Sequence, residues 1–336
     1  MAIWAYGLEV HIGTPPQPIR VLLDIEMDTF HVQSVRCHTS ICEDNNQTTF
    51  NSSASNTFNS LNNFTRLSYA AARVEGYLSE DTLNIGGLQI ASQRFVDATY
   101  IGPLGFLHFY SGFNGALGFA PGHVNRRPYA PSPWETIVAN HLLNQNIFSI
   151  VLPKGRRDID SYKPRTNGEF LIGDVPEGWS EESAITLPLK WSSYAYATSL
   201  ESLQFGTSYE SFAGKEGTAY FFTTWPFITL PLRWIKMIAK QVPRVEPRRI
   251  FVPCHNRTKL PDFTFGIGRK NITLTPLQYT FEEIFNGTVV CSMSLLREDD
   301  EDTIGLGWPF LENFGVVFDV DHNEVKLNYQ NKYQPE

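Results

Sequence analysis

Two stretches of this chain repeat one pattern. Apolar residues 21–23 lead directly into Asp24, and residues 219–221 lead into Phe222 in the same way. Each stretch is followed further along by a segment in which glycine alternates with apolar residues, at 115–120 in the first half and 305–311 in the second. This repetition indicates a degenerate internal duplication, with two halves built alike. The central residue is a carboxylate in one half and an aromatic ring in the other.

Length and charge limit what the chain can be. Its 336 residues suffice for two lobes with a core each, and a charged, apolar-poor stretch at 155–167 places the boundary there. We therefore expect domains at 1–160 and 161–336. The formal net charge of −8 argues against a nucleic-acid partner, and no apolar run reaches membrane-spanning length. We expect a monomer without a cofactor.

Cysteines and glycosylation motifs indicate the compartment. Six Asn-X-Ser/Thr motifs occur, at Asn46, Asn51, Asn63, Asn256, Asn271 and Asn286. Cys37 and Cys42 lie five apart in a polar loop, and Cys254 and Cys291 flank a strand-like segment. We predict these two disulfides, six glycosylation sites and a secreted or secretory-lumen protein. Because Met1 directly precedes the first expected strand, any leader is expected to have been removed.

A metal site at the first cysteine pair is the alternative to a disulfide there. His38 lies next to Cys37, which would offer a third ligand. No second ligand pair follows, so we favour the disulfide and expect no metal.

Short alternating segments predict an all-β protein with few helices. The strands are expected at 4–12, 19–23, 146–153, 168–173, 183–190, 194–205, 217–222, 263–267, 316–320 and 324–329. Residues 66–69 and 76–90 are expected to form a hairpin with Tyr69 near its tip. A capping box at 132–135 starts one helix, and a second is expected at 232–241.

The ordered set of motifs resembles the pepsin-like aspartic protease family over nearly the whole chain. The matching segments are 6–17, 21–24, the Cys37–Cys42 loop, 67–69, 113–118, 260–265 and 306–319. The resemblance implies a bilobal all-β fold with pseudo-twofold symmetry and a central cleft under a flap. It also implies one catalytic Asp-Thr-Gly motif in each lobe, with the two carboxylates sharing a proton.

The catalytic motifs depart from the family. The first is Asp24-Ile25-Glu26, and the second is Phe222-Thr223-Thr224, which lacks the carboxylate. The flap continues from Tyr69 into alanines and Arg73, where family members are glycine-rich. Trp308 stands where a family member often has Asp. Because the chemistry needs both acids, we expect no pepsin-type proteolysis.

Several residues keep two interpretations. Asp24 is a lone acid or a relic that hydrogen-bonds backbone, and Glu26 is a second acid or, with Asp28, a solvated loop charge. His31 is a core histidine or a site residue, and Tyr69 is expected to line the site. The aromatics fill a redundant cavity or form an apolar pocket. The expected cleft-lining residues are Asp28, His31, Tyr69, Arg73, Phe222, Thr223, Thr224, Trp225 and Trp308.

Two classes of function remain open. The first is a secreted binding or inhibitor-like pseudoprotease whose partner is an apolar small molecule or a secreted enzyme. The second is a cleft that catalyses a non-proteolytic reaction, such as cyclisation or isomerisation, on an apolar small molecule. In that case Asp24, Glu26 or Tyr69 would act as acid or hydrogen-bond donor.

Overall fold

The chain folds into two compact, mostly β units. The computed structural model describes residues 6–43, 48–69, 72–102, 112–120, 131–153, 168–190, 195–242, 250–285 and 288–330. Unit 1 comprises Met1–Asn144 with Ser192–Ala195, and unit 2 comprises Gln145–Trp191 with Tyr196–Glu336. The all-β prediction is confirmed. The predicted boundary between residues 160 and 161 lies outside the described residues and stays a prediction.

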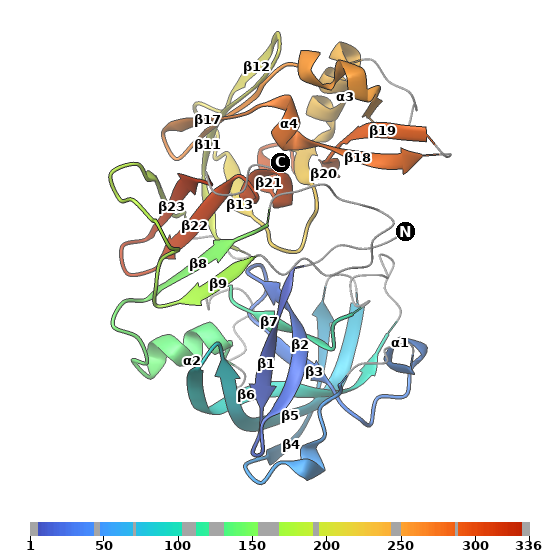
Figure 1. Ribbon diagram of the computed structural model, residues 1–336, viewed down its shortest axis with the longest axis vertical. Coiled ribbons are helices and arrows are strands. Elements are labelled where there is room, and N and C mark those ends of the chain that lie inside the picture. The colour runs from blue at the N-terminus through green and yellow to red at the C-terminus, as the bar shows by residue number, and fades with distance from the viewer. Residues whose placement is uncertain are drawn as a thin grey trace. The chain divides into compact units, whose positions relative to one another are not determined.

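Unit 1 is built on one seven-stranded sheet (Figure 1). Its strands are β1 (Gly7–Ile12), β2 (Gln17–Asp24), β3 (Phe30–Gln33), β4 (Asn59–Tyr69), β5 (Ala72–Ile85), β6 (Leu88–Ile101) and β7 (Gly115–Gly118), in the order β1-β2-β7-β3-β6-β5-β4. The short helices are α1 (Ser40–Glu43), η1 (Ser52–Ala54) and α2 (Pro133–Ala139). The predicted capping box on α2 is confirmed, since Ser132 and Glu135 each bond the other's backbone N–H.

Strand β7 lies between β2 and β3 and holds them together. It pairs in parallel with β2, where Asp24 is opposite Gly118, and antiparallel with β3. The chain between β2 and β3 must therefore reverse around the end of β7, and Asp24 is the last strand residue before that reversal.

The hairpin β4–β5 is the element expected as a flap. Its strands pair antiparallel from Asn59 opposite Glu80 to Tyr69 opposite Ala72, with the tip at residues 70–71 outside the described part. The single strand predicted over 76–90 is wrong, because Gly86 and Gly87, both at positive φ, turn the chain between β5 and β6. Alternating apolar residues on both sides of this two-residue turn concealed it.

The described residues of unit 2 form three sheets. The first has the order β10-β23-β22-β8-β9, the second β17-β16-β11-β13-β21-β14-β20 with β12 on β11, and the third β15-β19-β18. Their strands are β8 (Ile147–Val151), β9 (Glu169–Ile172), β10 (Ile185–Pro188), β11 (Ala197–Phe205), β12 (Ser208–Ser211), β13 (Thr218–Phe221), β14 (Ile228–Pro231), β15 (Phe251–Val252), β16 (Phe263–Ile267), β17 (Lys270–Leu274), β18 (Thr280–Phe285), β19 (Thr288–Met293), β20 (Leu295–Glu298), β21 (Thr303–Leu306), β22 (Phe314–Asp319) and β23 (Glu324–Tyr329). The helices are α3 (Leu232–Gln241), η2 (Cys254–Lys259), α4 (Pro276–Tyr279) and α5 (Trp308–Leu311).

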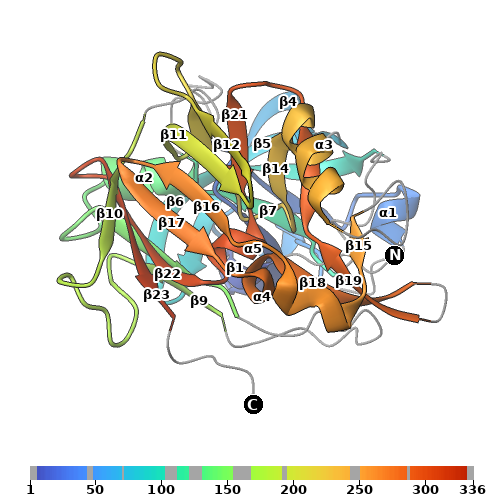
Figure 2. The same cartoon turned by 90° about the horizontal axis from the view of Figure 1, so that it is seen from above.

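Strand β21 has the role in unit 2 that β7 has in unit 1. It pairs in parallel with β13 and antiparallel with β14. Helix α3 packs against β14 and β20 and buries Trp234 and Ile238. Figure 2 shows α3 beside β14. The internal duplication predicted from the sequence is thus present as one repeated arrangement of three strands.

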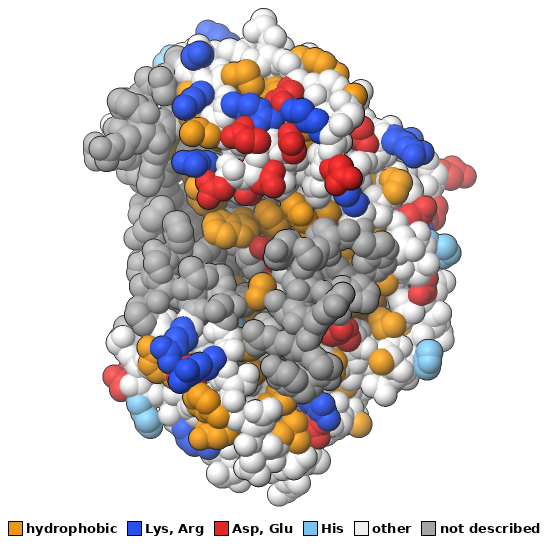
Figure 3. All heavy atoms as spheres, turned by 180° about the vertical axis from the view of Figure 1, so that it is seen from behind, with side chains coloured by type: hydrophobic (Ala, Val, Ile, Leu, Met, Phe, Trp, Pro, Cys, Tyr) orange, Lys and Arg blue, Asp and Glu red, His pale blue; other side chains and the backbone are white. Residues whose placement is uncertain are grey.

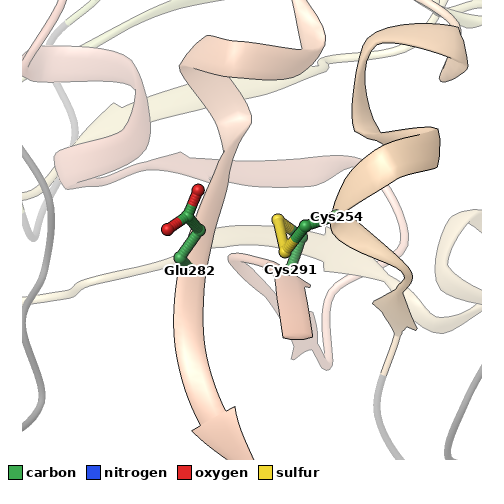
Figure 4. A group of neighbouring side chains, drawn as sticks. All are labelled: Cys254, Glu282 and Cys291. Carbon is green, nitrogen blue, oxygen red and sulfur yellow. A yellow bond between two sulfur atoms is a disulfide. The ribbon is translucent and has the colours of Figure 1, made fainter. Parts of the chain in front are cut away.

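Both predicted disulfides are confirmed. Cys37 pairs with Cys42 in α1, and Cys254 at the start of η2 pairs with Cys291 in β19. Figure 4 shows the carboxylate of Glu282 beside the second pair. Because the two sulfurs are bonded to each other, they offer no thiolate to a metal there.

Acidic and basic side chains alternate over the face of unit 2 seen in Figure 3. One network joins β12 to α3, where Arg233 pairs with Glu210 and Glu301, and the Trp234 indole donates to Glu210 over 2.6 Å. Burial would raise the pKa of Glu210, but the hydrogen bonds from Arg233 and Trp234 and the nearby positive charges lower it overall. Within the described residues, no helix has the length and apolarity needed to cross a membrane.

Candidate functional site

The first turn, residues 24–29, is organised by the carboxylate of Asp24. The side chain is 2% exposed, and its Oδ1 accepts hydrogen bonds from the N–H groups of Glu26 at 2.7 Å and Met27 at 3.1 Å. The Asp24 carbonyl accepts from the Phe119 N–H at 2.7 Å. Asp24 therefore fixes the conformation of its own turn and ties it to the end of β7.

Gly118 lets the turn and β7 approach each other closely. A Cβ at this position would lie 2.5 Å from the Met27 carbonyl oxygen and 2.5 Å from backbone atoms of Thr29. No side chain fits there, because the obstructing atoms belong to the backbone and cannot rotate away. Glycine at 118 is thus required by the geometry of the turn.

The second turn, residues 222–227, follows β13 in the same way. The Phe222 N–H donates to the Leu306 carbonyl at 3.2 Å, one residue after the last paired position, Phe221 opposite Leu306. Continuing this register places Phe222 opposite Gly307, as Asp24 is opposite Gly118.

Gly307 confirms that the two turns correspond. A Cβ there would lie 2.3 Å from the Trp225 carbonyl oxygen and 2.2 Å from that of Phe227. These residues are three and five positions after Phe222, just as Met27 and Thr29 are three and five after Asp24. Pairing and glycine packing agree, so Phe222 occupies in unit 2 the position that Asp24 occupies in unit 1.

The Phe222 ring is held by an aromatic neighbour and a glycine. It stacks on Tyr220, with 6.1 Å between ring centroids and 4° between ring planes. A Cβ on Gly305 would lie 2.3 Å from Phe222 Cε2, so the ring lies directly over the bare backbone of β21. Phe222 is half-buried, and it presents an ordered apolar face in place of a carboxylate.

Trp308 ties the second turn from α5. Its indole Nε1–H donates to the Thr223 carbonyl at 2.6 Å, and its backbone N–H donates to the Trp225 carbonyl at 3.0 Å. The side chain is only 1% exposed. Trp308 is therefore packed inside unit 2, where it positions the backbone of the turn.

The remaining predicted residues near the turns differ in burial. Glu26, Thr224 and Trp225 are half-buried, whereas Asp28 and Thr223 are buried. The structure thus brings Asp24, Glu26 and Asp28 into one turn of unit 1. It brings Phe222, Thr223, Thr224, Trp225 and Trp308 together in unit 2.

His31 lies in the interior of the unit 1 sheet. It is 0% exposed in β3, opposite Val96 of β6 and Ala116 of β7. Burial lowers the pKa of His31 to about 4, so the ring is neutral at physiological pH.

Tyr69 and Arg73 lie at the end of the β4–β5 hairpin. The backbone of Tyr69 ends β4, and its side chain is outside the described part. Arg73 is exposed and pairs with Glu75, which Arg66 also contacts at 2.8 Å. The guanidinium of Arg73 also lies 5.7 Å from the centroid of the Tyr100 ring. Arg73 is therefore engaged by Glu75 of its own hairpin and by Tyr100 of the neighbouring strand β6.

Two residues near the second turn were not among the site residues predicted from the sequence. Tyr220 supplies the stacking partner of Phe222, and Gly305 supplies the space under its ring. The spacing of Tyr220 and Phe222 on a strand was the available signal, since residues two apart share a face. Gly305 could not be recognised, because its contact crosses between strands distant in sequence.

A comparison of the sequence with known protein families identifies the family. Residues 5–330 match the family model described as eukaryotic aspartyl protease, and the chain belongs to this family.

Curated relatives include a vacuolar protease A from Aspergillus fumigatus, 27% identical over 96% of this chain and 78% of its own length. Pepsin A from Gallus gallus is 26% identical over 96% of this chain and 83% of its own length, and gastricsin from Mus musculus is 25% identical. These relatives bear the names of proteases.

Proposed function

We propose that this protein is a secreted, N-glycosylated pseudoprotease that acts as a binding or inhibitor-like protein. One observation carries the proposal: Phe222 occupies the position equivalent to Asp24. Pepsin-type hydrolysis needs two carboxylates, one as base on a water and one as acid. A phenyl ring can neither ionise nor hold that water, so the residue set supports binding better than proteolysis.

The first turn also departs from a catalytic one. Asp24 remains buried and hydrogen-bonded, but Ile25 and Glu26 replace the Thr and Gly that the family motif carries. In an active family member the carboxylate at the position of Asp24 binds the attacking water. Here Glu26 adds a side chain close to that carboxylate. Asp24 thus keeps its role in fixing the turn, while its catalytic partners are missing.

A protease assay tests the loss of hydrolysis. The protein and the Phe222→Asp variant are incubated with denatured haemoglobin at pH 3 to 5, with and without pepstatin. We expect no pepstatin-sensitive cleavage from either, because Ile25, Glu26 and Thr224 still alter both motifs, and losing one member of a catalytic unit removes nearly all its effect. Pepstatin-sensitive cleavage by the unmodified protein would overturn the proposal.

The proposed ligand surface is the aromatic face of Phe222 with Tyr220 and Trp225. An apolar or aromatic ligand suits such a face better than an extended peptide. Titration with an anilinonaphthalene sulfonate dye should show weaker binding for Phe222→Ala. The control is Tyr209→Ala, which removes an aromatic that is 64% exposed on β12. Equal dye binding by Phe222→Ala and the unmodified protein would exclude this surface.

The second candidate function is non-proteolytic catalysis on an apolar small molecule. The buried, hydrogen-bonded carboxylate of Asp24 favours it, because such a group could position or protonate a substrate. Asp24→Asn should then abolish turnover while dye binding at Phe222 persists.

The secretory location rests on the two confirmed disulfides.

A further inference from the structure

Four of the six glycosylation motifs lie in described parts of the chain, and they differ in their surroundings. Asn63 and Asn271 are exposed, whereas Asn51 and Asn256 are half-buried. Asn46 and Asn286 lie outside the described residues. The four can therefore be compared residue by residue.

The two half-buried asparagines use their side-chain oxygens locally. Asn51 Oδ1 accepts from the Ser53 N–H at 3.1 Å and caps η1, and the Asn51 backbone makes two hydrogen bonds to the Gln17 side chain. Asn256 Oδ1 accepts from Lys259 at 3.5 Å within η2. Both side chains serve the local fold.

The two exposed asparagines lie on strands at the edges of sheets. Asn63 is in β4, the last strand of the seven-stranded sheet, and Asn271 is in β17, the last strand of the eight-stranded sheet. Among the described residues, β4 pairs only with β5 and β17 only with β16. Each strand therefore leaves one row of backbone groups available to another chain.

The strand conformation places each motif on one face. Residues two apart share a face, so Asn63 lies on the same side as Thr65, and Asn271 on the same side as Thr273. Directly opposite Asn271 is Gly266, where a Cβ would lie 2.2 Å from Ser202 Oγ and 3.3 Å from Asn271 Oδ1. The hydroxyl of Ser202 thus occupies the space above Gly266, and Asn271 itself is exposed.

We propose that Asn63 and Asn271 carry N-linked glycans and that these glycans shield the open edges of β4 and β17 from pairing with other chains. The inference rests on the secretory location in the proposed function. A glycan at either site is large and hydrated beside an unpaired strand, so it hinders edge-to-edge association. Strand β4 has a second feature that hinders edge-to-edge pairing. It is a bulge between Ser60 and Asn63, with Asn62 at positive φ.

The modification transfers an oligosaccharide from a lipid-linked diphosphate donor. The asparagine Nδ2 forms a bond to C1 of the first sugar, and the bond between C1 and the diphosphate oxygen breaks. The amide nitrogen loses one proton, and the lipid diphosphate leaves with the electron pair of the broken bond.

The first experiment maps glycopeptides of the full chain secreted from a eukaryotic host. We expect Asn63 and Asn271 to carry glycans. Enzymatic release of a glycan converts its asparagine to Asp and adds a heavy oxygen, which marks the site. Glycans found only at other motifs would overturn the inference while leaving the secretory location intact. Disulfide-bonded protein with no glycan at any motif would overturn the inference and the proposed N-glycosylation, whereas protein with four free thiols would overturn the secretory location.

The second experiment measures association by size-exclusion chromatography with light scattering. Asn63→Gln with Asn271→Gln should shift the protein from monomer mass toward dimer mass or above at equal concentration. The control is Ser53→Ala, which removes the motif at Asn51 on η1 and should leave the mass unchanged. Enzymatic removal of the glycans from the folded protein of wild-type sequence should give the same shift in mass, without any substitution. Deglycosylated protein that stays monomeric would overturn the shielding role.

Discussion

Asp24 and Trp308 each stabilise one turn, but with opposite hydrogen-bonding roles. The Asp24 carboxylate accepts from two backbone N–H groups of the first turn. The indole and backbone N–H groups of Trp308 donate to two carbonyls of the second turn. The second turn is thus held without a carboxylate at its start, which is consistent with Phe222 at that position.

His31 should make unit 1 sensitive to acid. The pKa of His31 is lowered to about 4 by burial, whereas the unfolded chain has the ordinary value of 6.5. Above pH 6.5 the ring is neutral in both states. As pH falls from 6.5 to 4, the unfolded chain takes up a proton that the folded protein does not, so the free energy of unfolding falls, by on the order of 3 kcal/mol at most.

Urea unfolding at pH 7 and pH 4.5 measures this effect. We expect the free energy of unfolding of His31→Leu to fall less between pH 6.5 and pH 4 than that of the wild-type protein. This holds whatever the stability of the variant at pH 7. His11→Gln, which changes a surface histidine of β1, serves as the control. If His31→Leu lost as much free energy of unfolding between pH 7 and pH 4.5 as the wild-type protein, the prediction would be wrong.

At the scale of elements, each central strand needs a glycine at its end: Gly118 is the last residue of β7, and Gly307 directly follows β21. Gly118→Ala and Gly307→Ala each place a methyl group against fixed backbone oxygens, and should lower the free energy of unfolding by roughly 1–3 kcal/mol or more. The comparison is Gly315→Ala in β22, where the new Cβ would lie 3.6 Å from its nearest neighbour, an ordinary contact. Denaturant midpoints for the three variants test this. A near-neutral Gly118→Ala would show that the first turn can move away from β7.

Elements with strong local signals were predictable from the sequence. Helix α3 and strands β16 and β23 have the predicted limits, because amphipathic periodicity and flanking turn residues define them. Strands β14, β15, β20 and β21 are not predicted, because they are short and pair with strands distant in sequence. Strands β12, β17, β18 and β19 pair with a sequence neighbour but are only four to six residues long, which leaves little periodicity to recognise. The repeated motif located both turns, and the two-residue spacing of Tyr220 and Phe222 is a local signal for their stacking, but the contact of the Phe222 ring with Gly305 depends on packing between strands distant in sequence.

At the scale of the whole molecule, the two disulfides should contribute unequally to stability. Cys254–Cys291 spans 37 positions and Cys37–Cys42 only 5. In the chain-entropy description, closing the longer loop contributes about 4 kcal/mol and the shorter about 2 kcal/mol. Double Cys→Ala variants of each pair should therefore lose stability in that order in guanidinium unfolding. A larger loss from Cys37→Ala with Cys42→Ala would show that the short loop has an additional structural role.

The close approach of Gly118 and Gly307 to their turns has a consequence for how such a protein can change over time. Backbone contacts, made three and five residues downstream, set the course of each turn, and they do not involve the side chain at its first position. Mutation at position 222 can therefore alter the chemistry while the scaffold persists, whereas the Asp24 carboxylate also holds the backbone of its own turn. A protein designer could exploit the same independence by introducing new side chains at position 222, together with a residue at 305 small enough to leave them room.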